Sequence, residues 1–361
     1  MFKNFFKYFV LILIVSFVSS CFLFTESGYY KGPKSDHFDG KKFFNPEFND
    51  PIKKNFMSYY KAKAKYESEN GKSKWVDNLI EVKTFNPKPQ IQDKISITFV
   101  GHSTFLLQFS NLNILTDPIW SNRASPVKFL GPKRAKKPGI NFDDLPKIDV
   151  VLISHSHYDH LDLPTLKNLN NKFAPKFYVG LGICHFFNKI KKLNFDCTEL
   201  DWGQNTIFNE NLAINFEPAR HWSKRMFFGS NATLWGAFVL QTKLGNIYFA
   251  GDTGYGDHFK KAKEKYQNFE LAMLPIGAYK PEDFMIRHHI SPLQAVMAHK
   301  ELNAKKSIAM HFETFQLASD NFKDPANELK KQLKEQNIEK DFLLLEVGEN
   351  LEININKTNQ K

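Results

Sequence analysis

The sequence predicts an α/β fold in which short strands deliver polar side chains to one rim of a sheet. Alternating apolar residues at 95–99 and 105–109 are typical of half-buried strands, and helix-like apolar spacing follows farther along the chain. Several short apolar runs end directly at a histidine or an aspartate. That placement is expected where loops at one rim of a sheet build a site.

The individual elements follow from local pattern. Strands are expected in the short apolar or alternating runs 95–99, 105–109, 150–153, 211–216, 246–250 and 306–310, with closing strands in 342–353. Helical spacing predicts helices in 51–69, 164–169, 181–193, 292–302 and 328–337. The helix at 292–302 has a clear start, because Ser291 can cap it and Pro292 suits its first position.

The densest group of metal-binding side chains is the run His155-Ser156-His157-Tyr158-Asp159-His160, directly after the apolar stretch 150–153. Neutral imidazole nitrogens and carboxylate oxygens suit zinc and other first-row divalent ions. The spacing lets His155 and His157 bind one ion while Asp159 and His160 reach a second. Histidines that only satisfy hydrogen bonds rarely cluster so densely, so this run predicts a metal site.

A site for two ions needs more ligands, and later strands end in suitable donors. His221 follows the strand at 211–216, Asp252 follows 246–250, and His311 follows 306–310. Taken singly, each is more typical of an ordinary histidine or a turn-forming aspartate. Their joint occurrence after the run 155–160 predicts that they complete the site.

The order of these donors resembles the ligand series of the metallo-β-lactamase superfamily. The flanking sequence is more similar still to the N-acyl-phosphatidylethanolamine-hydrolysing phospholipase D family, over about residues 94–322. The matching sequence motifs are 100–104 (VGHST), 116–119 (TDPI), 123–126 (RASP), 131–134 (GPKR), 155–162 (HSHYDHLD), 218–222 (PARHW), 251–255 (GDTGY), 274–279 (LPIGAY) and 304–307 (AKKS). The resemblance implies a metallo-β-lactamase fold, a four-layer αββα sandwich.

The resemblance also implies which donors share an ion, with two Zn²⁺ as cofactors and other divalent metals suited to the same donors. The assignment is His155, His157 and His221 to one ion, Asp159, His160 and His311 to the other, and Asp252 to a bridge between them.

His289 matches a position of the family, whereas the two residues after His311 depart from the family pattern. His289, in 289–292 (HISP), matches a family histidine placed near the substrate phosphate. The adjacent His288 and a solvated loop residue are the alternatives for this position. The family usually shows a tryptophan after the last ligand histidine, whereas this chain has Phe312 and then Glu313.

The ligand count predicts hydrolysis. Two divalent ions lower the pKa of a shared water and clamp the oxygens of an in-line displacement at phosphorus. Asp159 would ligate and orient that water, and His289 would stabilise the developing charge or protonate the leaving group. With the resemblance, this implies a di-zinc phosphodiesterase that splits N-acyl-phosphatidylethanolamine or a related envelope phospholipid into phosphatidic acid and an N-acylethanolamine.

The amino terminus predicts export and a lipid anchor. Residues 1–7 carry two lysines and no acid, residues 8–17 are mostly apolar, and Val18-Ser19-Ser20-Cys21 resembles a bacterial lipobox. Acylated Cys21 would hold the enzyme on a membrane of a bacterial cell envelope. A plain signal peptide and an uncleaved anchor are the alternatives.

Composition indicates where the domain boundaries lie and predicts a basic surface. We expect a lipoprotein-type signal peptide at 1–20, a tether and N-terminal extension at 21–94, and a hydrolase domain at 95–361. The formal net charge of +11 favours anionic surfaces such as phospholipid. The basic cluster 133–137 (KRAKK) is expected to be a solvated loop or to face lipid head groups.

Two cysteines follow the predicted anchor, and an exported protein could join them. Because Cys184 falls in a helix-like apolar stretch and Cys197 in a predicted loop, we expect free buried thiols.

Other functions stay open: opening of a phosphorylated lactone, cleavage of RNA, or a non-catalytic, metal-binding surface lipoprotein. The lipobox-like start disfavours cytoplasmic sugar or RNA metabolism, so nucleic acid is not the expected partner. The presence of every candidate ligand disfavours a decayed site. The sequence leaves the oligomeric state open.

Overall fold

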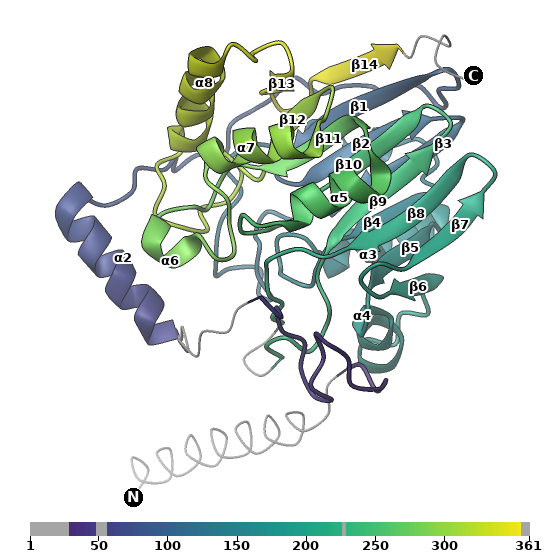
Figure 1. Ribbon diagram of the computed structural model, residues 1–361, viewed down its shortest axis with the longest axis horizontal. Helices are drawn as coiled ribbons and strands as arrows, with labels where there is room; N and C mark the ends of the chain where they lie inside the picture. The colour runs from purple at the N-terminus through teal and green to yellow at the C-terminus, as the bar shows by residue number, and fades with distance from the viewer. Residues whose placement is uncertain (1–28, 48–55, 226–228, 355–361) are drawn as a thin grey trace, which may run out of the picture.

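Two seven-stranded mixed sheets pack face to face at the centre of the molecule (Figure 1). The computed structural model describes residues 29–47, 56–225 and 229–354. The predicted signal peptide 1–20, Cys21 and the first five residues of the helix expected at 51–69 lie outside these described residues. Within the described ranges, no helix combines the length and the apolar character needed to cross a membrane.

The first sheet has the strand order β14-β1-β2-β3-β4-β5-β6. Its strands are β1 (Lys94–Gly101), β2 (Thr104–Phe109), β3 (Leu112–Thr116), β4 (Val150–Ile153), β5 (Lys176–Gly180), β6 (Cys197–Leu200) and β14 (Asn350–Asn354). Pairing is antiparallel from β14 to β3 and parallel from β3 to β6. The carboxyl ends of β3 and β4 therefore meet at the same edge.

The second sheet repeats this plan with the order β13-β12-β11-β10-β9-β8-β7. Its strands are β7 (Asn205–Asn209), β8 (Leu212–Glu217), β9 (Ala237–Thr242), β10 (Gly245–Phe249), β11 (Phe269–Pro275), β12 (Ser307–Met310) and β13 (Phe342–Leu343). Pairing is antiparallel from β7 to β10 and parallel from β10 to β13. The carboxyl ends of β10 and β12 thus point to a common edge.

Helices cover the outer faces of the two sheets (Figure 1). The helices are α2 (Phe56–Asn70), α3 (Leu163–Phe173), α4 (Ile183–His185), α5 (His258–Tyr266), α6 (Glu282–Met285), α7 (Pro292–Leu302) and α8 (Asp324–Gln336), with the 3₁₀ turn η1 (Phe142–Asp144) and the π-helical turn η2 (Phe186–Ile190). Of these, α2 stands to one side of the sandwich (Figure 1). Helix α7 contacts β11, α5 and α8, whereas α4 contacts β5 and β6. The structure confirms the predicted four-layer αββα sandwich.

Strand β4 shows why the layers form. Val150 and Leu152 belong to the core between the sheets, whereas Val151 and Ile153 pack with Leu166 of α3 on the outer face. Because both faces of the strand are buried, its sequence is continuously apolar rather than alternating. The chain leaves this buried strand directly into the run that begins with His155.

Several elements match their predicted limits and others differ. Helix α7 begins and ends as predicted, and its capping box is present: Ser291 Oγ accepts from the backbone of Gln294, whose side chain accepts from the backbone of Ser291. The helix predicted at 181–193 ends early, at the close of η2. The closing strands predicted in 342–353 form, but β13 and β14 belong to different sheets.

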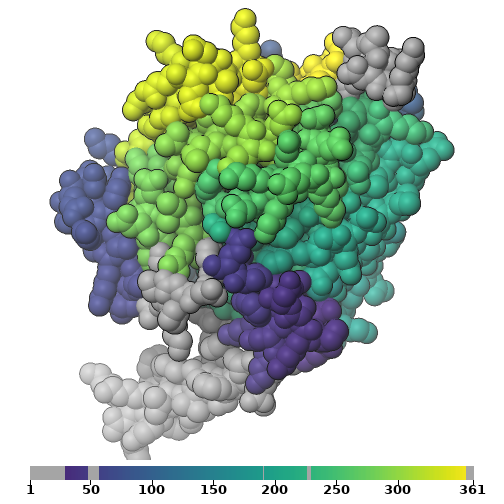
Figure 2. Space-filling view, in the orientation of Figure 1, coloured from purple at the N-terminus to yellow at the C-terminus, as the bar shows by residue number. Residues whose placement is uncertain are grey.

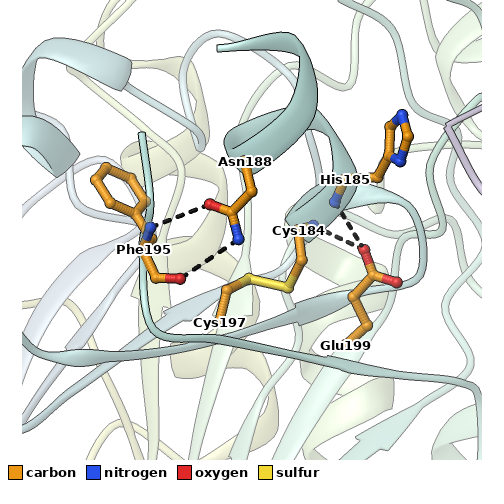
Figure 3. Close-up of a disulfide and its surroundings, with 6 residues drawn as sticks. All are labelled: Cys184, His185, Asn188, Phe195, Cys197 and Glu199. Atoms are coloured by element: carbon orange, nitrogen blue, oxygen red, sulfur yellow. Dashed lines mark hydrogen bonds between the residues drawn. A yellow bond between two sulfur atoms is a disulfide. The ribbon is translucent and has the colours of Figure 1, made fainter. Parts of the chain in front are cut away.

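The prediction of free thiols at Cys184 and Cys197 is wrong, because a disulfide joins them across a Cα–Cα distance of 5.7 Å (Figure 3). The carboxylate of Glu199 accepts from the backbone N–H groups of Cys184 and His185, at 2.7 and 3.2 Å. These bonds dock the start of α4 on β6. The two sulfurs meet because Cys197 opens that strand rather than lying in a loop.

The N-terminal segment 29–47 lies against the αββα sandwich, where Figure 2 shows it in purple over teal and green residues. Phe38 and Phe43 are buried and join the main core. Asn45 Nδ2 donates to the backbone carbonyl of His221 at 2.7 Å. The segment therefore packs beside a loop that carries one of the predicted metal ligands.

Candidate metal centre

All seven predicted donors come together at one rim of the sandwich, although they lie on four separate loops. The run 155–160 follows β4 in the first sheet. The other three donors follow strands of the second sheet, with His221 after β8, Asp252 after β10 and His311 after β12. Face-to-face packing of the sheets is what brings the two groups of loops together.

Three imidazole nitrogens form the first donor set. Nδ1 of His157 lies 2.8 Å from Nε2 of His155 and 3.1 Å from Nε2 of His221. Burial holds the pKa values of His155 and His221 well below their ordinary range, with neighbouring imidazoles adding to the effect, and burial lowers the pKa of His157 to about 4. The three rings are therefore neutral near pH 7, as metal ligation requires.

The second donor set combines one carboxylate and two imidazoles. Oδ2 of Asp159 lies 3.2 Å from Nε2 of His160 and 3.3 Å from Nε2 of His311. Burial opposes charge on these rings, but the carboxylates of Asp252 and Asp159 outweigh it and raise the pKa of His311 to about 9. They also hold the pKa of His160 well above its usual value. An ion bound at this set must displace protons from both rings.

One atom, Oδ2 of Asp252, lies next to both sets. It is 3.1 Å from Nε2 of His311 and 3.2 Å from Nε2 of His160, and it is 3.8 Å from Nε2 of His221 and 4.0 Å from Nε2 of His155. A carboxylate with that placement is suited to bridge two ions. The geometry therefore agrees with the bridging role that the family resemblance implies for Asp252.

The donor cluster fits divalent ions by a second criterion, hydrogen bonding. Within the part of the chain that the structure describes, Nε2 of His160 makes no hydrogen bond although carboxylate oxygens of Asp159 and Asp252 lie 3.2 Å away, and buried Oδ1 of Asp252 has no hydrogen-bond partner. Buried polar atoms in folded proteins are almost always paired, so orphaned atoms facing one cluster require an explanation. Coordination of zinc or a similar ion by imidazole nitrogen and carboxylate oxygen supplies it.

Asp117 supports the cluster from behind, a role that the sequence did not reveal. It follows β3 and accepts from Nδ1 of His160 at 2.6 Å. It also accepts from the backbone N–H and the hydroxyl of Ser154, at 2.7 and 2.6 Å. With one proton of His160 held at Nδ1, Nε2 is the atom that would lose its proton and present a lone pair to an ion bound in the donor cluster. The only sequence signal for Asp117 was its place in the family-matching segment 116–119.

His102 is a second residue that sequence reasoning missed. It lies on the turn between β1 and β2 at a positive φ of 59°, and its Nε2 is 2.9 Å from Oδ2 of Asp159. Its ring is 4.2 Å from that of His311. Burial and the neighbouring His311 lower the pKa of His102 to about 3, so the neutral ring donates a hydrogen bond to Asp159. Its only sequence signal was its place in the family-matching motif 100–104.

The structure distinguishes the roles of His288 and His289. Nδ1 of His289 lies 3.9 Å from Oδ2 of Asp252, and its ring is 5.1 Å from that of His221. The backbone carbonyl of His288 accepts a hydrogen bond from Nδ1 of His221 at 2.9 Å. His289 is therefore the one whose ring meets the donor cluster, and it is buried rather than a solvated loop residue.

Phe312 and Glu313, where the chain departs from the family pattern, both point away from the donors. Phe312 stacks on Phe99 between the sheets at a centroid distance of 5.7 Å. Glu313 is buried and pairs with Lys136 at 2.5 Å and Lys323 at 2.9 Å.

The prediction of a solvated loop at 133–137 is wrong for its three central residues, because Arg134, Ala135 and Lys136 are buried. Arg134 donates to the backbone carbonyls of Ile119 and Ser121 at 2.8 and 3.0 Å. Lys133 and Lys137 are the exposed members of the cluster.

Comparison with known proteins agrees with this architecture. The beta-lactamase superfamily domain matches residues 112–312. The chain is 37% identical over 264 residues to N-acyl-phosphatidylethanolamine-hydrolyzing phospholipase D 1 of Caenorhabditis elegans, covering 70% of this chain and 74% of that protein. It is 36% identical over 239 residues to the mitochondrial N-acyl-phosphatidylethanolamine-hydrolyzing phospholipase D of Saccharomyces cerevisiae, covering 64% of this chain and 50% of that protein.

A solved structure shares the fold at lower identity. Isothiocyanate hydrolase from Delia radicum gut bacteria superposes with a TM-score of 0.56 at 20% identity, over 71% of this chain and 98% of that chain. Fold and donor cluster together define a metal-dependent hydrolase of the beta-lactamase superfamily. Within it, the chain belongs to the N-acyl-phosphatidylethanolamine-hydrolysing phospholipase D family, which confirms the resemblance found in the sequence.

Proposed function

We propose that this protein is a phosphodiesterase of phospholipase D type, which hydrolyses N-acyl-phosphatidylethanolamine or a related envelope phospholipid to phosphatidic acid and an N-acylethanolamine. The observation that carries the proposal is the pair of donor sets sharing Oδ2 of Asp252. Two adjacent cations suit the displacement of an alkoxide from a phosphodiester. The substrate class is supported by the names of the two relatives that share more than a third of their aligned residues with this chain.

We propose zinc for both positions, because the donors are mostly imidazole. When bound, two such ions lower the pKa of a shared water toward neutrality and offset charge on the phosphate oxygens. The residues that would hold them are His155, His157 and His221 for one ion, Asp159, His160 and His311 for the other, and Asp252 for both.

The remaining polar residues would orient the reactants. Asp159 receives the hydrogen bond of His102, which fixes the carboxylate beside His160 and His311. Burial lowers the pKa of His289 to about 4, so its ring is neutral near pH 7 and carries one N–H. We therefore assign His289 to hydrogen bonding with a phosphoryl oxygen, in preference to full proton transfer to the leaving alkoxide.

We propose that the enzyme is exported and anchored to a membrane of the cell envelope through acylated Cys21. The lipobox-like residues 18–21 suggest the anchor. The disulfide between Cys184 and Cys197 supports export, because such bonds persist in oxidising compartments and are rare in the cytoplasm. Residues 21–94 would link this anchor to a hydrolase domain that spans 95–361.

One experiment separates this proposal from its rivals. Bound metal is measured on the purified protein, and turnover is then compared on a fluorescent N-acyl-phosphatidylethanolamine, a phosphorylated lactone and an RNA. We expect metal in the protein and selective release of the N-acylethanolamine. Faster turnover of the lactone or the RNA would identify another hydrolase of the superfamily. Bound metal without turnover of any of the three would favour a non-catalytic surface lipoprotein.

A further inference from the structure

The segment that connects β3 to β4 contains an apolar tip on a braced stem. We define the tip as residues 125–131 (SPVKFLG). An antiparallel bridge between Arg123 and Lys133 closes the stem. Beside it, the backbone N–H of Ala124 donates to the carbonyl of Pro132 at 3.1 Å, and that of Arg134 donates to Asn122 at 2.9 Å. The tip therefore projects from a two-stranded base rather than from an unstructured loop.

The turn itself is also internally fixed. The hydroxyl of Ser125 accepts from the backbone N–H of Val127 at 3.2 Å, and Nη1 of Arg123 donates to the carbonyl of Gly131 at 2.6 Å. Gly131 has a φ of +97°, and a Cβ at that position would lie 2.8 Å from Cβ of Ser125. Glycine is thus required to close this turn. The folded turn holds its central side chains outward.

Those outward side chains are large and apolar. Phe129 is 83% exposed, Leu130 is 66% exposed and Val127 is 37% exposed. Among all large apolar side chains that the structure describes, Phe129 is the most exposed. Single exposed apolar residues are ordinary, but a grouped set held outward on a braced turn is typical of a surface that binds a partner.

The charged residues of the segment that carries the tip are all positive. Lys128 lies within the tip, and Arg123 and Lys133 lie at its stem. No aspartate or glutamate occurs anywhere in residues 118–142. An apolar tip surrounded by cations and free of acids is complementary to an anionic lipid bilayer, with acyl chains below and phosphates above. A protein partner would not require acids to be absent from the whole segment.

The tip stands at the same rim as the donor cluster. At its base, Ser121 Oγ donates to Asp162 at 2.8 Å, only two residues after the donor His160. On the other side of the base, the guanidinium of Arg134 lies 4.9 Å from the ring centroid of Phe315, which packs edge-on against His102 at 5.2 Å. A bilayer that receives the tip would therefore lie on the side of the molecule where the candidate metal centre is built.

We propose that residues 125–131 form a membrane-inserting loop. Phe129 and Leu130 enter the boundary between head groups and acyl chains of an anionic bilayer, while Lys128, Arg123 and Lys133 contact lipid phosphates. This surface deepens the proposed function, because it identifies the bilayer as the partner at the catalytic rim. It rests on the proposed function only for the statement that the substrate is drawn from that bilayer.

A fluorescent label at the tip tests insertion directly. In the full chain carrying Cys21→Ser, Phe129→Cys provides one free thiol for an environment-sensitive dye, since Cys184 and Cys197 are joined. The matched control is Ile207→Cys, at a position that is 76% exposed on the edge strand β7. We expect phosphatidylcholine vesicles containing phosphatidylglycerol to blue-shift the dye at position 129. Brominated lipids should quench it, and the dye at position 207 should show neither change.

Three outcomes would overturn the insertion. The dye at position 129 could remain in water while the protein sediments with vesicles. It could respond no more than the dye at position 207. It could also shift with protein concentration when no lipid is present, which would identify the tip as a contact between copies of the chain. None of these readouts depends on catalysis, so they hold whether or not the protein hydrolyses N-acyl-phosphatidylethanolamine.

Activity provides a second, separable test. The double variant Phe129→Ser/Leu130→Ser should lose about tenfold in rate on substrate presented in anionic vesicles, because partition onto the bilayer falls. Its rate on a water-soluble, short-chain phosphodiester should stay unchanged, because the donor cluster is untouched. Ile207→Ser should alter neither rate. An equal loss on both substrates would assign the tip a structural role and refute the proposal.

Discussion

Nδ1 of His160 lies 2.6 Å from Oδ2 of Asp117, and both side chains are fully buried. The carboxylate follows β3 and the imidazole follows β4, so the parallel pairing of these two strands sets the contact. Asp117 is further fixed by Ser154. This arrangement decides which nitrogen of His160 carries the proton and which one faces Asp159 and Asp252.

We expect Asp117→Asn to lower metal affinity or activity by about 10- to 100-fold, because an amide can no longer hold the proton at Nδ1 of His160 as a carboxylate does. Titration of the metal-free protein with zinc, together with the rate of phospholipid hydrolysis, measures the effect. Asp143→Asn, at an exposed position in η1, is the matched control and should change neither. An unaltered zinc titration in Asp117→Asn would remove Asp117 from the support of the site.

The Asp252→Ala and His157→Ala proteins should differ in how much metal they retain. Asp252 lies beside both donor sets, so Asp252→Ala should release most of the bound metal and abolish hydrolysis. His157 belongs to the first set alone, so His157→Ala should abolish hydrolysis but keep about one ion per chain. Metal content and turnover are measured on the same samples, with His185→Ala as the control. Hydrolysis by a metal-free Asp252→Ala protein would contradict the mechanism.

The clustering of the candidate donors could be predicted because each of their loops follows a short apolar run, and that signal is local. His155, His221, Asp252 and His311 all stand within a few residues of the end of a buried strand. Parallel pairing and packing of the two sheets then bring strand ends together without further information from the chain. The clustering of these side chains could therefore be predicted from short apolar runs that each end near a histidine or an aspartate, taken together with the dense run 155–160.

The parts that sequence did not predict depend on tertiary contact. His102 lies on an ordinary-looking turn and reaches Asp159 only because the strand order of the first sheet places the β1–β2 turn at the same edge as the end of β4. Lys136 belongs to a basic run in the sequence, yet it is buried because it forms an ion pair with Glu313, which is far away in the sequence. The disulfide depends on Cys197 opening an edge strand whose register no local pattern specifies. Long-range register and pairing are the common cause of these differences.

The disulfide should contribute to stability and not to catalysis. Replacement of Cys184 and Cys197 by serine should lower the free energy of unfolding by about 3 kcal/mol, since the bond closes a loop with a sequence separation of 13. Chemical denaturation under oxidising conditions measures the loss, and zinc-saturated activity at moderate temperature should persist. A reducing agent should reproduce the loss in the unsubstituted protein. Equal denaturation midpoints with and without reductant would show that the bond is absent in solution.

Cys21 should determine where the protein is found. If it is acylated, Cys21→Ser should move most of the protein from the membrane fraction to the soluble fraction of the envelope, because the acyl chains that hold the mature protein on the membrane are lost. Activity measured in detergent should be unchanged. Fractionation and mass spectrometry of the N-terminal peptide test both points. A variant that stays in the membrane fraction with residues 1–20 still attached would instead indicate an uncleaved anchor.

The N-terminal segment should make stability depend on pH through His37. Burial lowers the pKa of this imidazole, but hydrogen bonds to Asp201 at 2.7 Å and Asp36 at 2.6 Å outweigh burial and raise it above its ordinary value of 6.5. A raised pKa means that the folded state holds the proton more tightly than the unfolded state. The stabilisation is therefore complete below pH 6.5 and declines as the pH rises through the folded-state pKa. Thermal unfolding across this range should show that decline in the natural protein and a flatter profile in His37→Gln. Parallel profiles for the two proteins would show that His37 is not held between these carboxylates in solution.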